Sequence, residues 1–213
     1  KQLEARSAKE RAVQLAPQDA GAHSNLGNTL KDLGRLDEAE ASYQQAIALK
    51  PDLAEAHSNL GIILKELGKL SESEASLKQA IAFKSDFVEA HSNLGITLQD
   101  LGKLNEAEAS FKHAIILKPD YAEAHNNLGS TLHELVRLDE AEASYTQAIA
   151  LKPGYARAYN NLGNTQREQG KLDAAEVSYM QAISLEPDFA EAHYSLGVTL
   201  QDLGRLNEAE ASY

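Results

Sequence analysis

The chain contains no cysteine, no tryptophan and a single methionine among its 213 residues. Without cysteine there is no disulfide framework, no cysteine-ligated zinc or iron–sulfur site and no thiol nucleophile. The absence fits a reducing compartment, and we expect a cytoplasmic location. Apolar residues still make up 43% of the chain, which is enough for a buried core, so we expect an ordered fold.

Long apolar runs and basic clusters are also missing. No apolar run approaches the roughly 20 residues that cross a bilayer, and no signal-peptide core opens the chain. There are 32 acidic and 20 basic side chains, which gives a formal net charge of -12. Because phosphate binding needs clustered Lys and Arg, the composition excludes DNA and RNA as partners. The helical pattern reaches Tyr213, so we expect the chain to be a module of a larger protein.

Glycine and proline are sparse, but they recur at intervals of 34 residues. Two glycine series and one proline series share this interval, and Val136 and Ser85 interrupt them: Gly27, Gly61, Gly95, Gly129, Gly163 and Gly197; Gly34, Gly68, Gly102, Gly170 and Gly204; Pro17, Pro51, Pro119, Pro153 and Pro187. A fixed period of this length is typical of a solenoid of stacked repeats.

Within one period the apolar spacing is helical. Residues of one face recur three or four positions apart, as in Ala56, Leu60, Leu64 and Leu67. Gly68 is placed to end this helix in the left-handed conformation, and a second apolar stripe follows it. Segments such as Asp52-x-x-Glu55 before the first helix and Asp37-x-x-Glu40 before the second predict capping boxes. Each period therefore predicts two helices joined by a turn.

A 34-residue helix–turn–helix unit of this kind resembles the tetratricopeptide repeat (TPR). The residues that carry the resemblance are Leu60-Gly61, Leu64, Gly68 and Ala80, with Ala39, Tyr43 and Pro51 in neighbouring repeats. The resemblance implies an all-α fold, a right-handed α-α superhelix or TPR solenoid. We expect one array of complete repeats at 20–53, 54–87, 88–121, 122–155 and 156–189. The second helix of a preceding repeat would occupy 1–19, and a truncated sixth repeat would occupy 190–213.

Motifs that carry chemistry are absent from the sequence. It has no G-x-S-x-G, no P-loop, no dinucleotide-binding glycine pattern and no H-E-x-x-H, so we expect neither catalysis nor a cofactor. Five histidines follow the repeat period: His23, His57, His91, His125 and His193. Equivalent positions on stacked repeats lie about 10 Å apart, too far for one zinc ion to join them. We therefore expect packing between helices for these histidines, surface positions for His113 and His133, and no metal site.

One polar series lacks a packing explanation. We call it the asparagine column: Asn25, Asn59, Asn93, Asn127 and Asn161, each directly before Leu-Gly. Asparagine costs a helix interior about 0.7 kcal/mol relative to alanine, but its amide both donates and accepts hydrogen bonds. The TPR resemblance places the column on the concave surface. There it is similar to the asparagine ladder of O-linked N-acetylglucosamine transferase, which implies binding of extended polypeptide. The alternative is that these asparagines bridge adjacent repeats.

Other residues are assigned to the same surface by their phase in the repeat: Asn28, Asn164, Lys31, Lys65, Arg157, Arg167 and Tyr194. Acidic residues leave this surface net negative, which favours a neutral or basic segment over an acidic one. The fifth repeat departs most from its neighbours, at Arg157 and Tyr159 among others. Both a specificity patch and relaxation after duplication explain that departure.

The sequence thus predicts a non-catalytic scaffold that binds an extended protein or peptide segment. Two alternatives remain open. One is a structural array that self-associates, for which the truncated C-terminal repeat supplies an uncovered apolar face. The other is the substrate-recognition part of a glycosyl- or sulfotransferase whose catalytic domain lies elsewhere.

Overall fold

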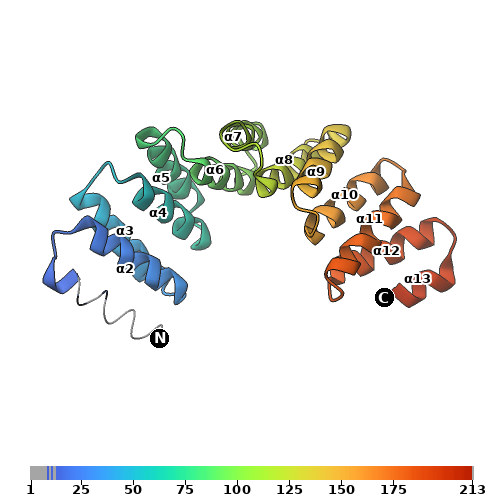
Figure 1. Cartoon of the computed structure of the whole chain (residues 1–213), viewed down its shortest axis with the longest axis horizontal. Helices are drawn as coiled ribbons and strands as arrows, with labels where there is room; N and C mark the ends of the chain where they lie inside the picture. Colours follow the sequence, from blue (N-terminus) through green and yellow to red (C-terminus); the bar gives the residue numbers. More distant parts are fainter. Residues whose placement is uncertain (1–8, 10, 12, 213) are drawn as a thin grey trace. The chain divides into compact units, whose positions relative to one another are not determined.

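The computed structural model describes residues 9, 11 and 13–212, and the predictions for residues 1–8, 10, 12 and 213 lie outside this part. Its helices are α2 (Ala20–Asp32), α3 (Leu36–Leu49), α4 (Ala54–Glu66), α5 (Leu70–Phe83), α6 (Val88–Asp100), α7 (Leu104–Leu117), α8 (Ala122–Glu134), α9 (Leu138–Leu151), α10 (Ala156–Glu168), α11 (Leu172–Leu185), α12 (Ala190–Asp202) and α13 (Leu206–Ser212). The all-α class and the helix–turn–helix repeats are confirmed (Figure 1). Within the described residues, none of the helices has both the length and the apolarity that a bilayer span requires.

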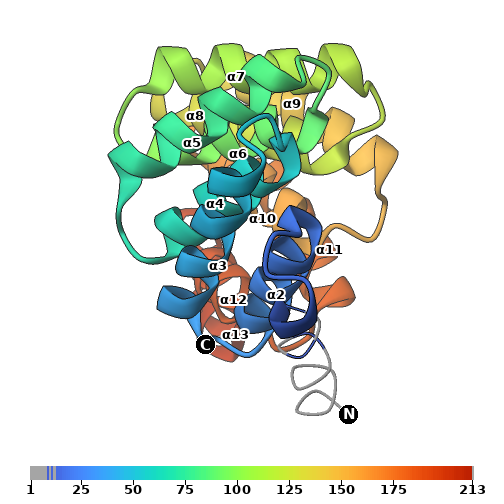
Figure 2. The same ribbon diagram turned by 90° about the vertical axis from the view of Figure 1, so that its left-hand side faces the viewer.

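The chain forms two compact units, which we call the N-terminal unit (residues 1–117, with α2–α7) and the C-terminal unit (residues 118–213, with α8–α13). In each unit the two helices of a repeat pack together, and the second helix also packs on the first helix of the next repeat. Figure 2 shows this succession for the N-terminal unit, from blue to green.

The first helices of neighbouring repeats approach each other more closely than the second helices do. In the N-terminal unit α2 contacts α4 and α4 contacts α6, and in the C-terminal unit α10 contacts both α8 and α12. Among the described helices of each unit, no second helix contacts the second helix of the next repeat. Each unit therefore has a face on which the first helices lie side by side, and we call it the first-helix face.

Glycine allows the two helices of a repeat to approach closely. A Cβ added at Gly129 would lie 2.7 Å from Cε1 of Tyr145, and one added at Gly61 would lie 2.6 Å from Cγ of Leu77. Both neighbouring side chains are buried in the core. A larger residue at these glycines would displace a core side chain rather than fill a gap.

The turns inside the repeats confirm the predicted left-handed positions. The glycines that end the first helices have positive φ: Gly34, Gly68, Gly102, Gly170 and Gly204. Val136 occupies the same place in the fourth repeat and adopts a φ of 59°. A residue with a Cβ pays roughly 1–2 kcal/mol for this conformation, so the turn before α9 is strained.

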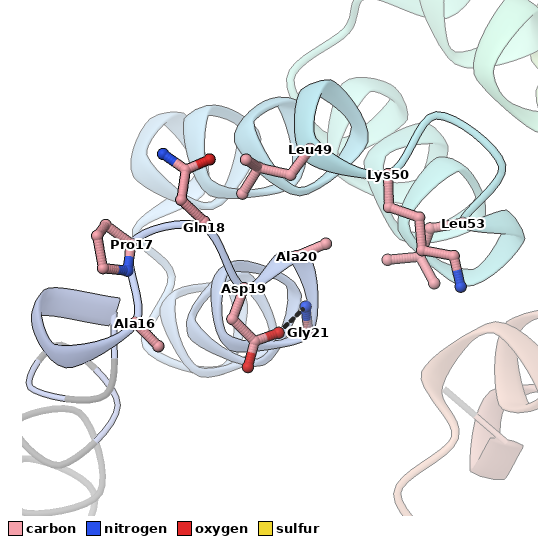
Figure 3. A pocket seen from close by; sticks show the side chains of 9 residues that line it. All are labelled: Ala16, Pro17, Gln18, Asp19, Ala20, Gly21, Leu49, Lys50 and Leu53. Carbon is pink, nitrogen blue, oxygen red and sulfur yellow. Dashed lines mark hydrogen bonds between the residues drawn. The ribbon is translucent and has the colours of Figure 1, made fainter.

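The predicted capping boxes are wrong. The start of α4 shows why, because Pro51 and Asp52 form a turn, closed by a bond from the Leu53 amide to the Lys50 carbonyl at 3.2 Å. The helix therefore begins one residue later, with Leu53 as an N-cap that has no side-chain bond. In α2 an aspartate does occupy this later position, and Asp19 Oδ1 accepts from the Gly21 amide at 2.8 Å (Figure 3).

Candidate functional site

In the N-terminal unit the asparagine column lies on the first-helix face. Asn25 on α2 is exposed, whereas Asn59 on α4 and Asn93 on α6 are half-buried. The Asn59 amide donates to Oδ1 of Asn28, one turn further along α2, at 3.1 Å. This bond shows that the column faces the neighbouring first helix, and that one of its members bridges two repeats, as the alternative interpretation predicted.

Asn28 is the centre of a small network. Its Oδ1 also accepts from the hydroxyl of Tyr43 at 2.7 Å. Burial raises the pKa of Tyr43 well above its ordinary value, and the negative charges of Asp32 and Glu66 raise it further. The tyrosine is therefore a neutral donor at physiological pH, and the Asn28 side chain occupies the space between α2, α3 and α4.

In the C-terminal unit the column makes a different bridge. The Asn161 amide on α10 donates to Oδ1 of Asn126 on α8 at 3.2 Å, and Asn126 donates in turn to Oδ1 of Asn127 at 3.3 Å. Asn127 and Asn161 are both half-buried. Two members of the column, Asn59 and Asn161, thus join adjacent repeats while they remain half-buried.

A polar pocket of about 160 Å³ lies next to this second bridge. It is lined by Ser130, His133, Glu134, Tyr145, Asn161 and Asn164. The Tyr145 hydroxyl donates to Ser130 Oγ at 3.2 Å. Burial raises the pKa of Tyr145 to about 12; the bond to Ser130 opposes the rise, while the charges of Glu134 and Glu168 add to it. The pocket therefore holds a neutral phenol at its inner end and carboxylates nearby.

The basic residues assigned to the first-helix face lie near the ends of its helices. Lys31, Lys65 and Arg167 are half-buried in the last turns of α2, α4 and α10. Lys65 Nζ lies 3.9 Å from Asp100 Oδ2, so it links α4 to α6. In the C-terminal unit His133 Nε2 similarly lies 3.2 Å from Glu168 Oε1. The cationic side chains of Lys31, Lys65 and Arg167 thus offset part of the acidic charge of this face.

The remaining predicted residues are spread along the C-terminal unit. Arg157 is exposed in the first turn of α10, and Arg167 is in its last turn, about 15 Å away along the helix axis. Tyr194 is an exposed residue of α12, whereas Asn164 Oδ1 accepts from the Tyr179 hydroxyl at 2.8 Å. The distinctive residues of the fifth repeat therefore lie at both ends of α10 instead of forming one cluster.

The periodic histidines hold the turns between repeats. His57 Nε2 lies 2.8 Å from the Pro51 carbonyl oxygen, and His91 Nε2 lies 2.9 Å from that of Ser85. The same contact, six residues back, recurs at His23, His125 and His193. Over the residues that the structure describes, no group of three or more His, Asp or Glu side chains is placed to hold a metal ion. Sequence reasoning missed the bond to the turn, although the constant six-residue spacing indicates it.

Two larger hollows lie elsewhere in the N-terminal unit. One, of about 770 Å³, is bordered by the turn before α2 and by residues 49, 50 and 53 (Figure 3). The other, of about 700 Å³, lies between α3 and α5 and is floored by His57, Leu60 and Leu64 of α4. No member of the asparagine column lines either hollow.

The family comparisons cover most of the array. A family model described as TPR repeat matches residues 27–68, 61–102 and 163–204, and two described as Tetratricopeptide repeat match residues 92–156 and 144–177. The search of curated proteins found no match. The resemblance of the asparagine column to that of O-linked N-acetylglucosamine transferase stays a hypothesis.

Solved structures share the fold over most of the chain. YrrB, described as a TPR protein with an unusual peptide-binding site, is 25% identical with a TM-score of 0.70; the match covers 87% of this chain and 95% of YrrB. MamA is 26% identical with a TM-score of 0.71, covering 78% of this chain and 97% of MamA. PilW, described as a type IV pilus biogenesis factor, is 22% identical with a TM-score of 0.84 and shows the fold alone; the match covers 91% of this chain and 90% of PilW. With its repeat period, its helix pairs and the residues matched by the family models, this chain belongs to the tetratricopeptide-repeat family.

Proposed function

We propose that this TPR scaffold binds an extended polypeptide segment on its first-helix faces, with the asparagine column as the backbone-binding element and without catalysis. One observation carries the proposal. Polar amides recur on first helices that lie side by side, and they remain exposed or half-buried although they lie among buried Leu and Gly residues. Packing alone would favour apolar or small residues at such positions.

The spacing of the column fits an extended chain. Packed helices lie about 8–10 Å apart, and an extended peptide advances about 3.3 Å per residue. Successive asparagines within a unit would therefore meet about every third residue of the ligand. An amide offers two donors and one acceptor, so it can pair with a peptide group whatever the ligand's side chain is. The bond from Asn59 to Asn28 uses only one of these donors.

Charge favours a neutral or basic ligand. Acidic residues end the first helices, namely Asp32, Glu66 and Asp100 in the N-terminal unit and Glu134, Glu168 and Asp202 in the C-terminal unit, and all six are exposed. The nearby cations offset this charge only in part. An acidic segment would meet like charges along the whole face, which disfavours it. The peptide-binding site of YrrB gives independent support for a peptide ligand on this fold.

A library of short peptides tests the proposal. We expect binding by the natural chain and a loss of at least about a hundredfold when all five column asparagines are replaced by alanine, because five hydrogen bonds of about 0.5–1.5 kcal/mol each sum to at least about 2.5 kcal/mol. The matched control replaces Gln44, Lys112 and Thr146, which are exposed residues of the second helices, by alanine. Unchanged affinity in the column variant, with its helicity intact, would reduce the column to a structural role.

A self-associating array is the second candidate function. Val177 and Met180 are exposed apolar residues one turn apart on α11, and Leu206 is exposed on α13. Light scattering over a range of concentrations tests this candidate. A mass that rises with concentration and falls after the change Met180→Lys would support it, and a constant monomer mass would exclude it. Sequencing the complete reading frame would show whether the same protein contains a transferase domain.

A further inference from the structure

The first and fourth repeats differ at the position one turn after the asparagine column, while Asn164 of the fifth repeat accepts from Tyr179 as Asn28 accepts from Tyr43. Asn28 holds this position on α2, and Ser130 holds it on α8. In the N-terminal unit the Asn28 amide reaches both Tyr43 and Asn59 and occupies the space between them. Ser130 is shorter; it accepts from Tyr145, and its hydroxyl lies 3.3 Å from the carbonyl of Asn126. Asn161 bonds to Asn126 instead, and the space beside Ser130 is open as the 160 Å³ pocket.

The size of this pocket suits one side chain. Pockets for drug-sized ligands measure about 300–1,000 Å³, so about 160 Å³ is too small for such a molecule. The pocket opens on the first-helix face, because its lining includes Asn161 of the column and Asn164 one turn further along α10. A peptide held by the column would therefore pass its mouth.

The lining of the pocket offers oxygen acceptors and, at Asn164, whose Oδ1 already accepts from the Tyr179 hydroxyl, an amide donor. The oxygens of Ser130, Tyr145 and Glu134 surround the space, and Asn161 adds its amide oxygen while its nitrogen donates to Asn126. An ammonium group brings three donors and no acceptor, and a guanidinium brings five donors. Both cations match such a lining better than a carboxylate does.

The charge around the pocket also favours a cationic side chain. Glu134 lines the pocket, and Glu168 reaches its edge through the contact with His133 at 3.2 Å. Both carboxylates raise the pKa of Tyr145, after the larger effect of burial, so their field extends to the inner wall. Half-enclosure by protein strengthens this field relative to open solvent.

We infer that this pocket is a specificity site that accepts one lysine or arginine side chain of the bound polypeptide. The inference rests on the proposed function and adds a defined position in the ligand. The asparagine column would hold the backbone, and the pocket would fix the register by reading a basic residue. Ser130 admits the side chain, and Glu134 supplies the countercharge.

A positional peptide scan tests this inference. Each position of an alanine-based peptide is changed in turn to lysine, arginine, norleucine or glutamate, and affinities are measured by fluorescence anisotropy. At one position we expect lysine and arginine to bind about tenfold more tightly than norleucine, since a hydrogen bond between charged groups contributes about 1.5–3 kcal/mol. Norleucine keeps the four-carbon chain of lysine and lacks its terminal ammonium group.

Three variants locate that preference. Ser130→Asn fills the pocket as Asn28 fills the equivalent space, and Glu134→Gln removes the charge while the shape stays. Both are expected to abolish the preference for lysine. Asp173→Asn, which removes an exposed acidic charge in the first turn of the second helix α11, is the matched control and should leave the preference unchanged. Glu134 is exposed, so its variant is expected to fold even if Ser130→Asn does not.

The outcomes separate the two proposals. A basic preference lost in Glu134→Gln and kept in Asp173→Asn supports the pocket. Peptides that bind without a positional preference, or with one that survives in Glu134→Gln, overturn the pocket and leave the proposed function standing. If none of the peptides binds, both proposals fail.

Discussion

The first repeat, in the N-terminal unit, and the fourth repeat, in the C-terminal unit, share their packing and differ in the polar side chains next to it. Gly27 faces Tyr43 in the first repeat as Gly129 faces Tyr145 in the fourth, at the same distance from an added Cβ. Next to this common core, the Asn28 side chain occupies the space beside Tyr43. In the C-terminal unit the shorter Ser130 leaves the equivalent space beside Tyr145 open as a pocket. Val136 also gives the C-terminal unit a strained turn where Gly34 has none.

This difference shows where a repeat protein can vary. Positions that face the partner helix are fixed by sterics, and their residues recur at the period of the chain. Positions one turn after the column are half-buried, and the chain carries both an asparagine that occupies the space there and a serine that leaves a pocket, on the same fold. If the pocket beside Ser130 accepts a basic side chain as we propose, specificity on this scaffold is set at these half-buried positions.

The largest expected effect tests the shared core. Gly129→Ala and Gly27→Ala each place a Cβ 2.7 Å from a buried tyrosine ring. We expect each to lower the free energy of unfolding by about 1–3 kcal/mol through overpacking, measured by urea denaturation. Gly154→Ala is the control, because an added Cβ there meets no atom within 4 Å. Equal stability of all three variants would show that the core does not need glycine.

The next prediction tests the N-terminal network. Asn28→Ala leaves the buried Tyr43 hydroxyl without its acceptor, and we expect a loss of about 1–2 kcal/mol in unfolding free energy. Asn28→Ser should cost less, because Ser130 accepts from Tyr145 in the C-terminal unit. Calorimetry shows whether Asn28→Ala loses more stability than Asn28→Ser. An equal loss of stability in both variants would show that a serine at position 28 does not act as Ser130 does.

The strained turn predicts a stabilising change. Val136 is a β-branched residue held in the left-handed conformation, and Val136→Gly removes this strain. The strain energy removed exceeds the entropic cost of a glycine, so we expect about 1 kcal/mol of added stability. Hydrogen exchange should slow in α8 and α9. The reverse change, Gly102→Val, should destabilise the N-terminal unit by a similar amount. Faster hydrogen exchange of α8 and α9 in Val136→Gly would show that Val136 does not strain the turn.

The smallest expected effect concerns pH. Burial lowers the pKa of His91; its bond to the Ser85 carbonyl opposes this, and the His113 ring, stacked 4.2 Å away, lowers it further. Between the native pKa and about 6.5 the unfolded chain binds more protons, so stability falls as the pH falls through this window. His91→Tyr adopts the residue that Tyr159 provides in the fifth repeat and should weaken the dependence. Thermal unfolding of both proteins at pH 5 and 7 checks this. If the stability of His91→Tyr depends on pH as strongly as that of the natural chain, groups other than His91 cause the dependence.

Much of the fold was predictable from the sequence. The positive φ at Gly68 and the close contact at Gly61 both follow from residues that recur with the period. The helix starts were not predicted, because Asp52 lies one residue too early and belongs to the Pro-Asp turn. A pattern of residue types does not distinguish an N-cap from the residue before it.

The candidate site was predictable only in part. The phase of Asn59 placed it on the first-helix face, but its bond to Asn28 depends on distances between repeats that no periodicity contains. The pocket beside Ser130 was more difficult to predict. It forms because Ser130 is shorter than Asn28 at the equivalent position and because Asn161 donates to Asn126. Such differences appear only when two repeats are compared in space.

The most direct test of the account is a two-dimensional ¹⁵N NMR titration of the side-chain amides with a peptide selected from the library. If the first-helix faces bind the peptide backbone, the Nδ2 resonances of Asn59, Asn93, Asn127 and Asn161 shift with the same affinity, while Gln44 and Gln79 on the second helices do not. If Gln44 and Gln79 shift and the column resonances stay in place, the peptide binds the opposite side of the repeats, and the central claim is wrong.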